Sequence, residues 1–230
     1  MSGWRRTLMM QAAQRQYIEG YAVPVDGAYP ATIQARINNT LTTINVDQST
    51  GYWRWIGTIT SLNSFMLDSN NCSSVKIHYR DSTPISMYQL IRRCQTITHL
   101  DCSGVEVSNL YFAFGLNSTD YNNGYRSALQ SIKLPIIRNT TSSSNDCFAQ
   151  TRQLTDVEAS YIESSLSFSF SQLTLQSAIN ILNALQDVTS YGGKTLTFSS
   201  TTKGYINNDP DALALVANAV NNLGWTIALN

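Results

Sequence analysis

The C-terminal two thirds of the chain repeat one pattern of hydrophobic and polar positions. In each copy an apolar residue is followed by two positions, a second apolar residue, one position and a third apolar residue. Because alternate side chains of a strand lie on opposite faces, each copy predicts a short strand with one buried face. The copies are Cys72, Val75 and Ile77; Ile97, Leu100 and Cys102; Leu129, Ile132 and Leu134; Leu154, Val157 and Ala159; and a weaker one with Leu196 and Phe198 after Gly193.

The copies recur at a spacing that is typical of repeat architectures. Their middle positions, at residues 75, 100, 132, 157 and 196, are separated by 25, 32, 25 and 39 residues. Two of these intervals lie within the range of about 20–29 residues for leucine-rich repeats, and the longer ones leave room for insertions. Compact apolar segments at residues 85–91 and 110–114 predict helical returns between strands. The pattern therefore predicts an α/β fold over residues 71–230, an irregular leucine-rich-repeat-like solenoid with a short parallel sheet and helical returns.

The last 60 residues give distinct helix and strand signals. A helix is predicted at residues 175–185 and a strand at residues 195–198. A second helix is predicted from Pro210, with Asp209 as its cap, and a strand at residues 225–229 follows it. A helix and a strand of this kind are expected to cover the end of a repeat array. The apolar stripe of the second helix consists of Leu213, Val216, Ala217 and Val220.

Residues 1–70 show no regular period and are predicted to form a separate N-terminal arm and attachment region of irregular structure. The arm combines apolar anchors with arginines, which donate paired hydrogen bonds to carboxylates, and this favours docking on a partner. A tryptophan-rich stretch further on has residues of the kind that is enriched at interfaces. The alternatives are a disordered terminus and a core packed beneath the first repeat. The partner-binding candidates are Trp4, Arg5, Arg6, Leu8, Met9, Trp53 and Trp55.

Polar residues flank the middle apolar position of each copy and are predicted to form an exposed sheet face. If the strands pair in sequence order, Lys76, Asp101, Lys133 and Glu158 form a ladder of alternating charge with a spacing of about 4.8 Å. Such a ladder fits two roles. It is either a surface for a ligand or a row of ion pairs that stabilises and solubilises the sheet, each pair by about 0.2–1 kcal/mol. The predicted exposed face consists of Lys76, His99, Asp101, Lys133, Asp156 and Glu158.

Composition and charge narrow the classes of partner. Fifteen basic residues balance fifteen acidic ones and 13% of the chain is charged, which leaves no electrostatic footprint for nucleic acid. No stretch approaches the roughly 20 apolar residues of a membrane span. The start of the chain lacks the apolar run of a secretory signal. The four cysteines are widely separated, without a Cys-x-x-Cys pair, and are predicted to be buried thiols.

No pattern of residues points to catalysis. His99 and Asp101 could act as a base and its orienting partner, but no activated serine or cysteine accompanies them. Ser73 and Ser200 each begin a Ser-x-x-Lys tetrapeptide, yet the companion motifs of acyl-enzymes are missing. We therefore predict no catalytic residue, no cofactor and no metal, and we expect a protein that is not an enzyme.

Two segments resemble a known family. Residues 91–103, IRRCQTITHLDCS, and residues 146–155, DCFAQTRQLT, look like the Phe/Cys-bearing turn that leads into the next strand in BspA-like leucine-rich-repeat proteins of gut bacteria and their phages. Residues 212–229 are similar to the C-terminal cap of such proteins from phage genomes. The resemblance covers about residues 72–230 and implies an adhesive role without a shared catalytic site, here attachment or decoration within a virion.

These observations lead to three hypotheses. The first is a structural or attachment protein of a phage virion, in a tail, a fibre adaptor or a capsid, which binds other virion proteins or a host surface and assembles as a homo-oligomer. The second is a bacterial surface adhesin of the same family, located at the cell surface. The third is a hydrolase with an unrecognised site in residues 1–70.

Overall fold

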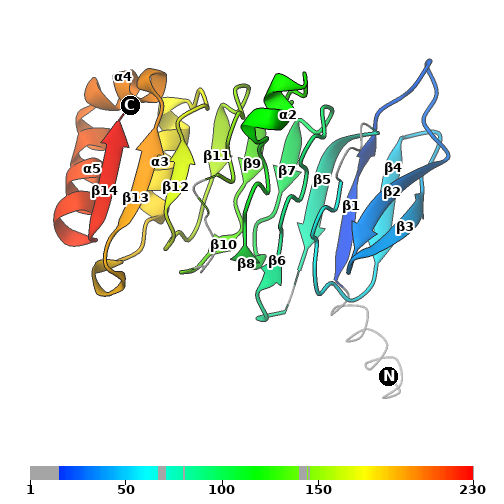
Figure 1. Cartoon of the computed structure of the whole chain (residues 1–230), viewed down its shortest axis with the longest axis horizontal. Coiled ribbons are helices and arrows are strands. Elements are labelled where there is room, and N and C mark those ends of the chain that lie inside the picture. The colour runs from blue at the N-terminus through cyan, green and yellow to red at the C-terminus, as the bar shows by residue number, and fades with distance from the viewer. Residues whose placement is uncertain (1–15, 67–70, 80, 140–143, 145, 230) are drawn as a thin grey trace, which may run out of the picture.

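The computed structural model describes residues 16–66, 71–79, 81–139, 144 and 146–229 (Figure 1). Its strands fall into a six-stranded sheet, two three-stranded sheets and a two-stranded hairpin. No described helix is long and apolar enough to cross a membrane. The strands are β1 (Tyr17–Ala22), β2 (Thr32–Ile37), β3 (Thr40–Asn45), β4 (Tyr52–Ile56), β5 (Cys72–His78), β6 (Ile85–Ser86), β7 (His99–Asp101), β8 (Glu106–Asn109), β9 (Ser131–Lys133), β10 (Ile136–Ile137), β11 (Asp156–Glu158), β12 (Leu166–Phe168), β13 (Lys194–Phe198) and β14 (Trp225–Leu229), and the helices are α2 (Ser118–Asn122), α3 (Leu175–Ala184), α4 (Ser200–Asn207), α5 (Pro210–Asn222) and a 3₁₀ turn (Thr189–Tyr191).

The first part of the described chain is an antiparallel arrangement of strands. Strand β1 pairs with β4 on one side and with β5 on the other, while β2 and β3 form a hairpin. The hairpin turns at Asn38 and Asn39, whose φ angles of 52° and 62° suit the two-residue turn that matches strand twist. The side-chain oxygen of Asn38 also accepts hydrogen bonds from the backbone N–H groups of Thr60 and Ser61. One turn residue thus holds the hairpin and the segment after β4 together.

The prediction of an irregular N-terminal region is wrong for residues 16–66. Buried and exposed side chains alternate there with the two-residue period of single strands. This alternation is not part of a longer repeated unit. In β2, Ile33, Ala35 and Ile37 are buried and the residues between them are exposed. Because β1 and β4 share a sheet with β5, the sheet spans the predicted domain boundary between residues 70 and 71.

The central six-stranded sheet has the strand order β11-β9-β7-β5-β1-β4. Strands β5, β7, β9 and β11 run parallel, whereas β1 is antiparallel to both of its neighbours, so the sheet is mixed. The middle apolar residues of the four copies, Val75, Leu100, Ile132 and Val157, lie opposite one another and are all buried. Their burial sets the register of the parallel strands, because a slip of one residue would turn them to solvent.

The predicted solenoid with helical returns is wrong. Residues 85–91 form the short strand β6 and turns, and residues 110–114 form turns and bends. Strands β6, β8 and β10 pair in a separate three-stranded sheet. The backbone N–H groups of Met87, Gln89 and Ile91 donate to carbonyl oxygens of the next connection along the chain. These bonds use the groups that a helix would pair internally, and the result is a mixed α/β fold with several sheets and few helices.

The predicted helices and strands of the C-terminal region are confirmed. Helix α3 begins after Thr174, and α5 begins at Pro210 after Asp209, and both preceding residues cap their helix through the side chain. Strands β13 and β14 lie where predicted and pair in parallel. Helix α4 has no apolar stripe from which it could be predicted, since its buried residues are Thr202 and Ile206 alone.

One hydrophobic cluster extends from β1 to the C-terminal elements. Within it the rings of Phe114, Phe148, Phe168 and Phe198 stack in sequence order, with centroids 5.1, 4.5 and 6.3 Å apart. All four cysteines are buried free thiols, as predicted. The sheets are therefore joined through packed side chains.

Strand β1 approaches its neighbours closely at Gly20. A Cβ atom there would overlap the Ser74 carbonyl oxygen of β5 and lie 2.7 Å from the ring of Trp53. The Trp53 side chain is 1% exposed, so neither obstacle can move without displacing the core. The position therefore requires glycine.

A buried carboxylate connects α2 to the turn after β6. Asp120 is 0% exposed and accepts hydrogen bonds from Arg92 Nε at 2.6 Å and Arg93 Nε at 2.7 Å. Burial disfavours its ionised form, but the hydrogen bonds and charges of the two arginines outweigh burial and hold the pKa of Asp120 below its ordinary value. The ionised carboxyl thus stabilises the fold.

We expect Gly20→Ala to lower the free energy of unfolding by about 1–3 kcal/mol, the range for overpacked cores. Gly204→Ala is the matched control: nothing lies within 4 Å of its added Cβ in α4, and alanine should stabilise the helix by about 0.5–1 kcal/mol. Urea denaturation of both variants measures the two effects. Equal stability of the two variants would contradict the close approach at Gly20.

Replacement of Asp120 by asparagine should lower the free energy of unfolding at pH 7 by about 1.5–3 kcal/mol, the range for hydrogen bonds to a charged group. Since the folded-state pKa is depressed, this stabilisation is present above the unfolded-state pKa of about 3.9 and is lost as pH falls through the folded-state pKa. The difference in free energy of unfolding between the variant and the native chain should therefore become smaller at the most acidic pH. Asp26→Asn, in an exposed turn, should leave the profile unchanged.

Candidate functional site

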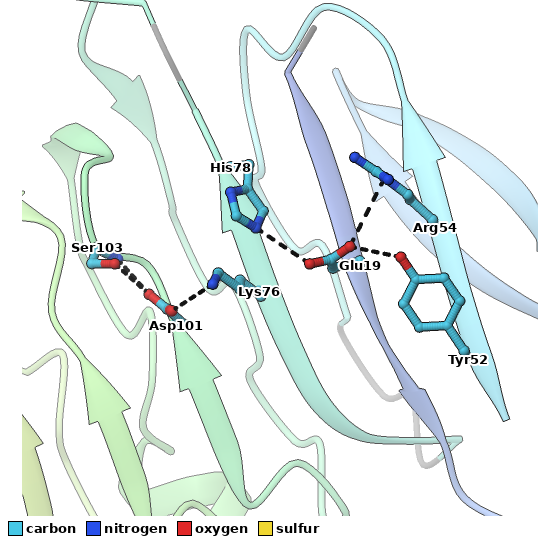
Figure 2. Close-up of polar contacts among 7 residues, drawn as sticks. All are labelled: Glu19, Tyr52, Arg54, Lys76, His78, Asp101 and Ser103. Carbon is cyan, nitrogen blue, oxygen red and sulfur yellow. Dashed lines mark hydrogen bonds and ion pairs between the residues drawn. The ribbon is translucent and has the colours of Figure 1, made fainter. Parts of the chain in front are cut away.

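Six charged side chains lie in one row across the central sheet, one from each strand. The pairing registers place Glu19 opposite Arg54 and Lys76, and Asp101 opposite Lys76 and Lys133. The charge changes sign at every strand. This charged row consists of Arg54, Glu19, Lys76, Asp101, Lys133 and Glu158, and Figure 2 shows the first four of them.

The sequence predicts four members of the charged row, and the structure places Lys76, Asp101, Lys133 and Glu158 at adjacent positions on four parallel strands. Glu19 extends the row by one strand, and Arg54 by another. Neither belongs to a copy of the repeated pattern, and the pairing of β1 with β5 joins residues almost 60 positions apart. The period-two alternation of β1 is the signal that could have placed Glu19 on the exposed face.

The charged row divides into three ion pairs. Lys133 Nζ lies 2.7 Å from Glu158 Oε2, and Lys76 Nζ lies 3.6 Å from Asp101 Oδ2. The hydrogen bond and charge of Glu158 raise the pKa of Lys133. The lysine side chains are 47% and 48% exposed, so solvent screens both pairs and each adds little to stability. The charged row is thus neutral overall, although the sign of charge changes from strand to strand.

Glu19 is the centre of the third pair and of the hydrogen bonds at this end of the row (Figure 2). Its carboxylate accepts from the Tyr52 hydroxyl at 2.6 Å, lies 3.9 Å from Arg54 Nε, and lies 3.3 Å from His78 Nε2. The His78 ring stacks on Tyr17 with centroids 3.9 Å apart. Burial, followed by the charge of the neighbouring lysine on β5, lowers the pKa of His78 against the opposing effect of Glu19.

A second row of polar residues runs beside the charged row, two positions away along each strand. His99 belongs to it, and its Nδ1 lies 2.7 Å from the hydroxyl of Thr98. Asp156 accepts a hydrogen bond from Thr155 at 2.7 Å. The members of this row, from β4 to β11, are Tyr52, Tyr21, Ser74, His99, Ser131 and Asp156.

A shallow groove of about 380 Å³ lies on this face, and residues of both rows line it. It extends from Tyr21 and Tyr52 at one end to Asp156 and Glu158 at the other. Tyr21 is 51% exposed, so an aromatic ring is available at the rim. All six residues of the predicted exposed face line the groove, together with residues of β1 and β4. The arrangement presents ion pairs, hydroxyls and aromatic edges to a ligand.

The structure separates the remaining partner-binding candidates. Trp53 is 1% exposed and belongs to the core, so the packed-core alternative holds for this residue. Trp55 is partly buried and packs against the same core. The arm candidates Trp4, Arg5, Arg6, Leu8 and Met9 lie outside the described residues.

Several described side chains on this face are engaged in contacts with one another. His99 and Asp101 lie on one strand, but His99 contacts Thr98, while Asp101 accepts from Ser103 and pairs with Lys76. Burial raises the pKa of the Cys72 thiol to about 12, so it is protonated at neutral pH. Among the described residues no group of three or more His, Cys, Asp or Glu side chains is placed to hold a metal ion.

A double-mutant cycle on Lys133→Ala and Glu158→Ala tests the charged row. We expect a favourable coupling of about 0.2–1 kcal/mol in the free energy of unfolding at low salt, which shrinks at high salt because exposed charges are screened. The control cycle combines Lys133→Ala with Asp211→Ala on α5, which is separated from the row by several strands, and its coupling should be zero. Equal couplings in the two cycles would refute a direct pair.

Comparison of the chain with protein-family models, with curated proteins and with solved structures gives no match in any of the three. The resemblance to BspA-like leucine-rich-repeat proteins therefore stays a prediction, and the candidate site rests on its geometry.

Proposed function

We propose that this chain is a non-enzymatic binding protein that acts by protein–protein contact through the groove face of its central sheet. The groove of about 380 Å³, lined by the charged row, carries the proposal. Flat sheet faces of this kind offer many side chains on a rigid support, which favours recognition of an extended surface. Exposed tyrosine at the rim adds the residue type that is enriched in the energetically dominant part of interfaces.

The alternating charges favour specificity over general attraction. Because Lys76, Asp101, Lys133 and Glu158 neutralise one another in pairs, these four side chains present no net charge that would draw partners of one sign. A partner binds this face favourably when its own charges alternate in the complementary order. A partner whose charges have the same order as the face is repelled. A protein surface with mixed charges fits this requirement better than a polyanion.

We further propose that the partner lies in a phage virion and that the chain is a structural or attachment component of the particle. The support is the resemblance of residues 72–230 to BspA-like proteins of phage genomes, together with a face suited to protein contacts. In the competing proposal, a bacterial surface adhesin, the same face binds a partner at the cell envelope.

Immunogold electron microscopy of particles and cells from the producing culture distinguishes the two locations. We expect label at one fixed position on phage particles. Label confined to the cell envelope would overturn the virion proposal and support the adhesin.

Variants of the groove face test the binding proposal in the same culture. Tyr21→Ala combined with Lys133→Ala should reduce the amount of chain per particle at least about tenfold, which corresponds to a loss of about 1.4 kcal/mol of binding free energy, less than truncation of one dominant interface residue removes. Tyr205→Ala with Lys194→Ala is the matched control, because Tyr205 is 48% exposed on α4 and Lys194 bonds the side chain of Asn139 on another surface. Equal incorporation of both double variants would refute a role for the groove.

A further inference from the structure

The C-terminal sheet ends in the edge strand β14. Its order is β12-β13-β14, so within the described residues β14 pairs with β13 alone. Two columns of apolar side chains cross this sheet, one through Leu166 and Leu196 to Ile227, the other through Phe168 and Phe198 to Leu229. The first two members of each column are 0% exposed, whereas Ile227 and Leu229 are partly exposed. Each column therefore ends at β14 in a side chain that packs against the core and is partly exposed.

Helix α5, which packs beside β14, presents apolar side chains at the same end of the molecule (Figure 1). Its buried residues are Ala212 and Ala219, while Leu213 and Val220 are 42% and 47% exposed. Spacings of three and four residues align the large side chains along one face. Leu213, Ala217 and Val220 form this outward stripe, while Leu215, Val216 and Leu223 pack against the core on the same side as Ala212 and Ala219.

Helix α5 has a single charged residue, Asp211 in its first turn, and β14 has none. Residues 212–229 contain no Asp, Glu, Lys or Arg, although 13% of the whole chain is charged. In a contact between identical surfaces about a two-fold axis, a residue near the axis lies next to its own copy. A charged residue there would therefore meet a like charge, and the two would repel. An uncharged apolar surface avoids this repulsion, so these residues suit a second copy of the same chain.

We propose that two copies of this chain associate through β14, which pairs antiparallel with β14 of the second copy and joins the two C-terminal sheets into one six-stranded sheet. With the two-fold axis perpendicular to the sheet at Ile227, Trp225 lies opposite Leu229 of the second copy. Side chains on one face of the sheet stay on that face, so the two apolar columns continue into the second copy. The outward stripes of the two α5 helices then meet on the same side of the sheet.

This interface is separate from the groove face, which lies on the central sheet. Pairing of β14 also satisfies the exposed backbone groups of an edge strand, which otherwise invite uncontrolled association. Antiparallel pairing about a two-fold axis is closed, because the β14 edge of each copy is used by the other copy, and this contact stops at a dimer.

Light scattering coupled to size exclusion tests the oligomeric state of the 230-residue chain. We expect a mass twice the 25.5 kDa of one chain at micromolar concentration. A monomer at all concentrations up to the millimolar range would overturn the proposal, and so would a trimer or a higher closed assembly.

A cysteine substitution tests the register. In Ile227→Cys the two introduced thiols face each other across the axis, where opposed residues have Cα atoms about 4.5–5.5 Å apart, a separation that permits a disulfide. Mild oxidation should produce a covalent dimer. Thr195→Cys, one strand further in on β13, is the matched control and should stay uncrosslinked, and the four native thiols are buried.

Charge at the same position provides a second readout that does not depend on oxidation. Ile227→Lys places two lysines in contact across the axis and should convert the dimer to a monomer, while Thr195→Lys adds the same charge to the same sheet and should leave the dimer intact. Circular dichroism confirms that each variant is folded. A dimer that persists in Ile227→Lys, or that forms without a crosslink in Ile227→Cys, would show that another surface holds the copies together and would overturn the proposal.

Discussion

The shared register of the central sheet is the constraint on which the other features depend. Val75, Leu100, Ile132 and Val157 are buried opposite one another, and a strand offers its side chains alternately to two faces. Once these apolar residues are aligned, the residues that follow them are aligned as well, on the opposite face. The charged row is therefore a direct consequence of packing the core, and the groove takes its lining from the same alignment.

Sequence patterns were sufficient where an element is specified by nearby residues. The repeated apolar triplets predicted β5, β7, β9 and β11, and helix caps such as Thr174 and Asp209 predicted α3 and α5. The connections were mispredicted because their apolar content suits a helix, whereas hydrogen bonds between consecutive connections, such as Gln89 N–H to the Tyr111 carbonyl, decide their conformation. Such bonds join residues far apart in sequence and leave no local periodic signal.

The candidate site shows the same division. Lys76, Asp101, Lys133 and Glu158 follow from the repeated pattern, whereas Glu19 and Arg54 enter the row through antiparallel pairing that no repeat encodes. The orientation of α5 was equally hidden, because a stripe of apolar residues predicts an amphipathic helix without saying which side has a partner. The structure shows which side that is: Ala212, Ala219 and their neighbours Leu215 and Val216 face the core, while Leu213 and Val220 face outward.

The column of stacked phenylalanine rings determines how the molecule loses its structure. The central sheet ends at β11 and the C-terminal sheet starts at β12, and no backbone ladder connects them. The rings of Phe114, Phe148, Phe168 and Phe198 cross this break without interruption. Phe168 and Phe198 belong to the C-terminal sheet, whereas Phe114 and Phe148 lie in the connections that follow β8 and precede β11. Opening on either side of the break therefore exposes a ring whose neighbour lies on the other side, so the two parts share one cooperative transition. Amide groups on both sides of the break should accordingly exchange with solvent through a common global opening and at similar slow rates.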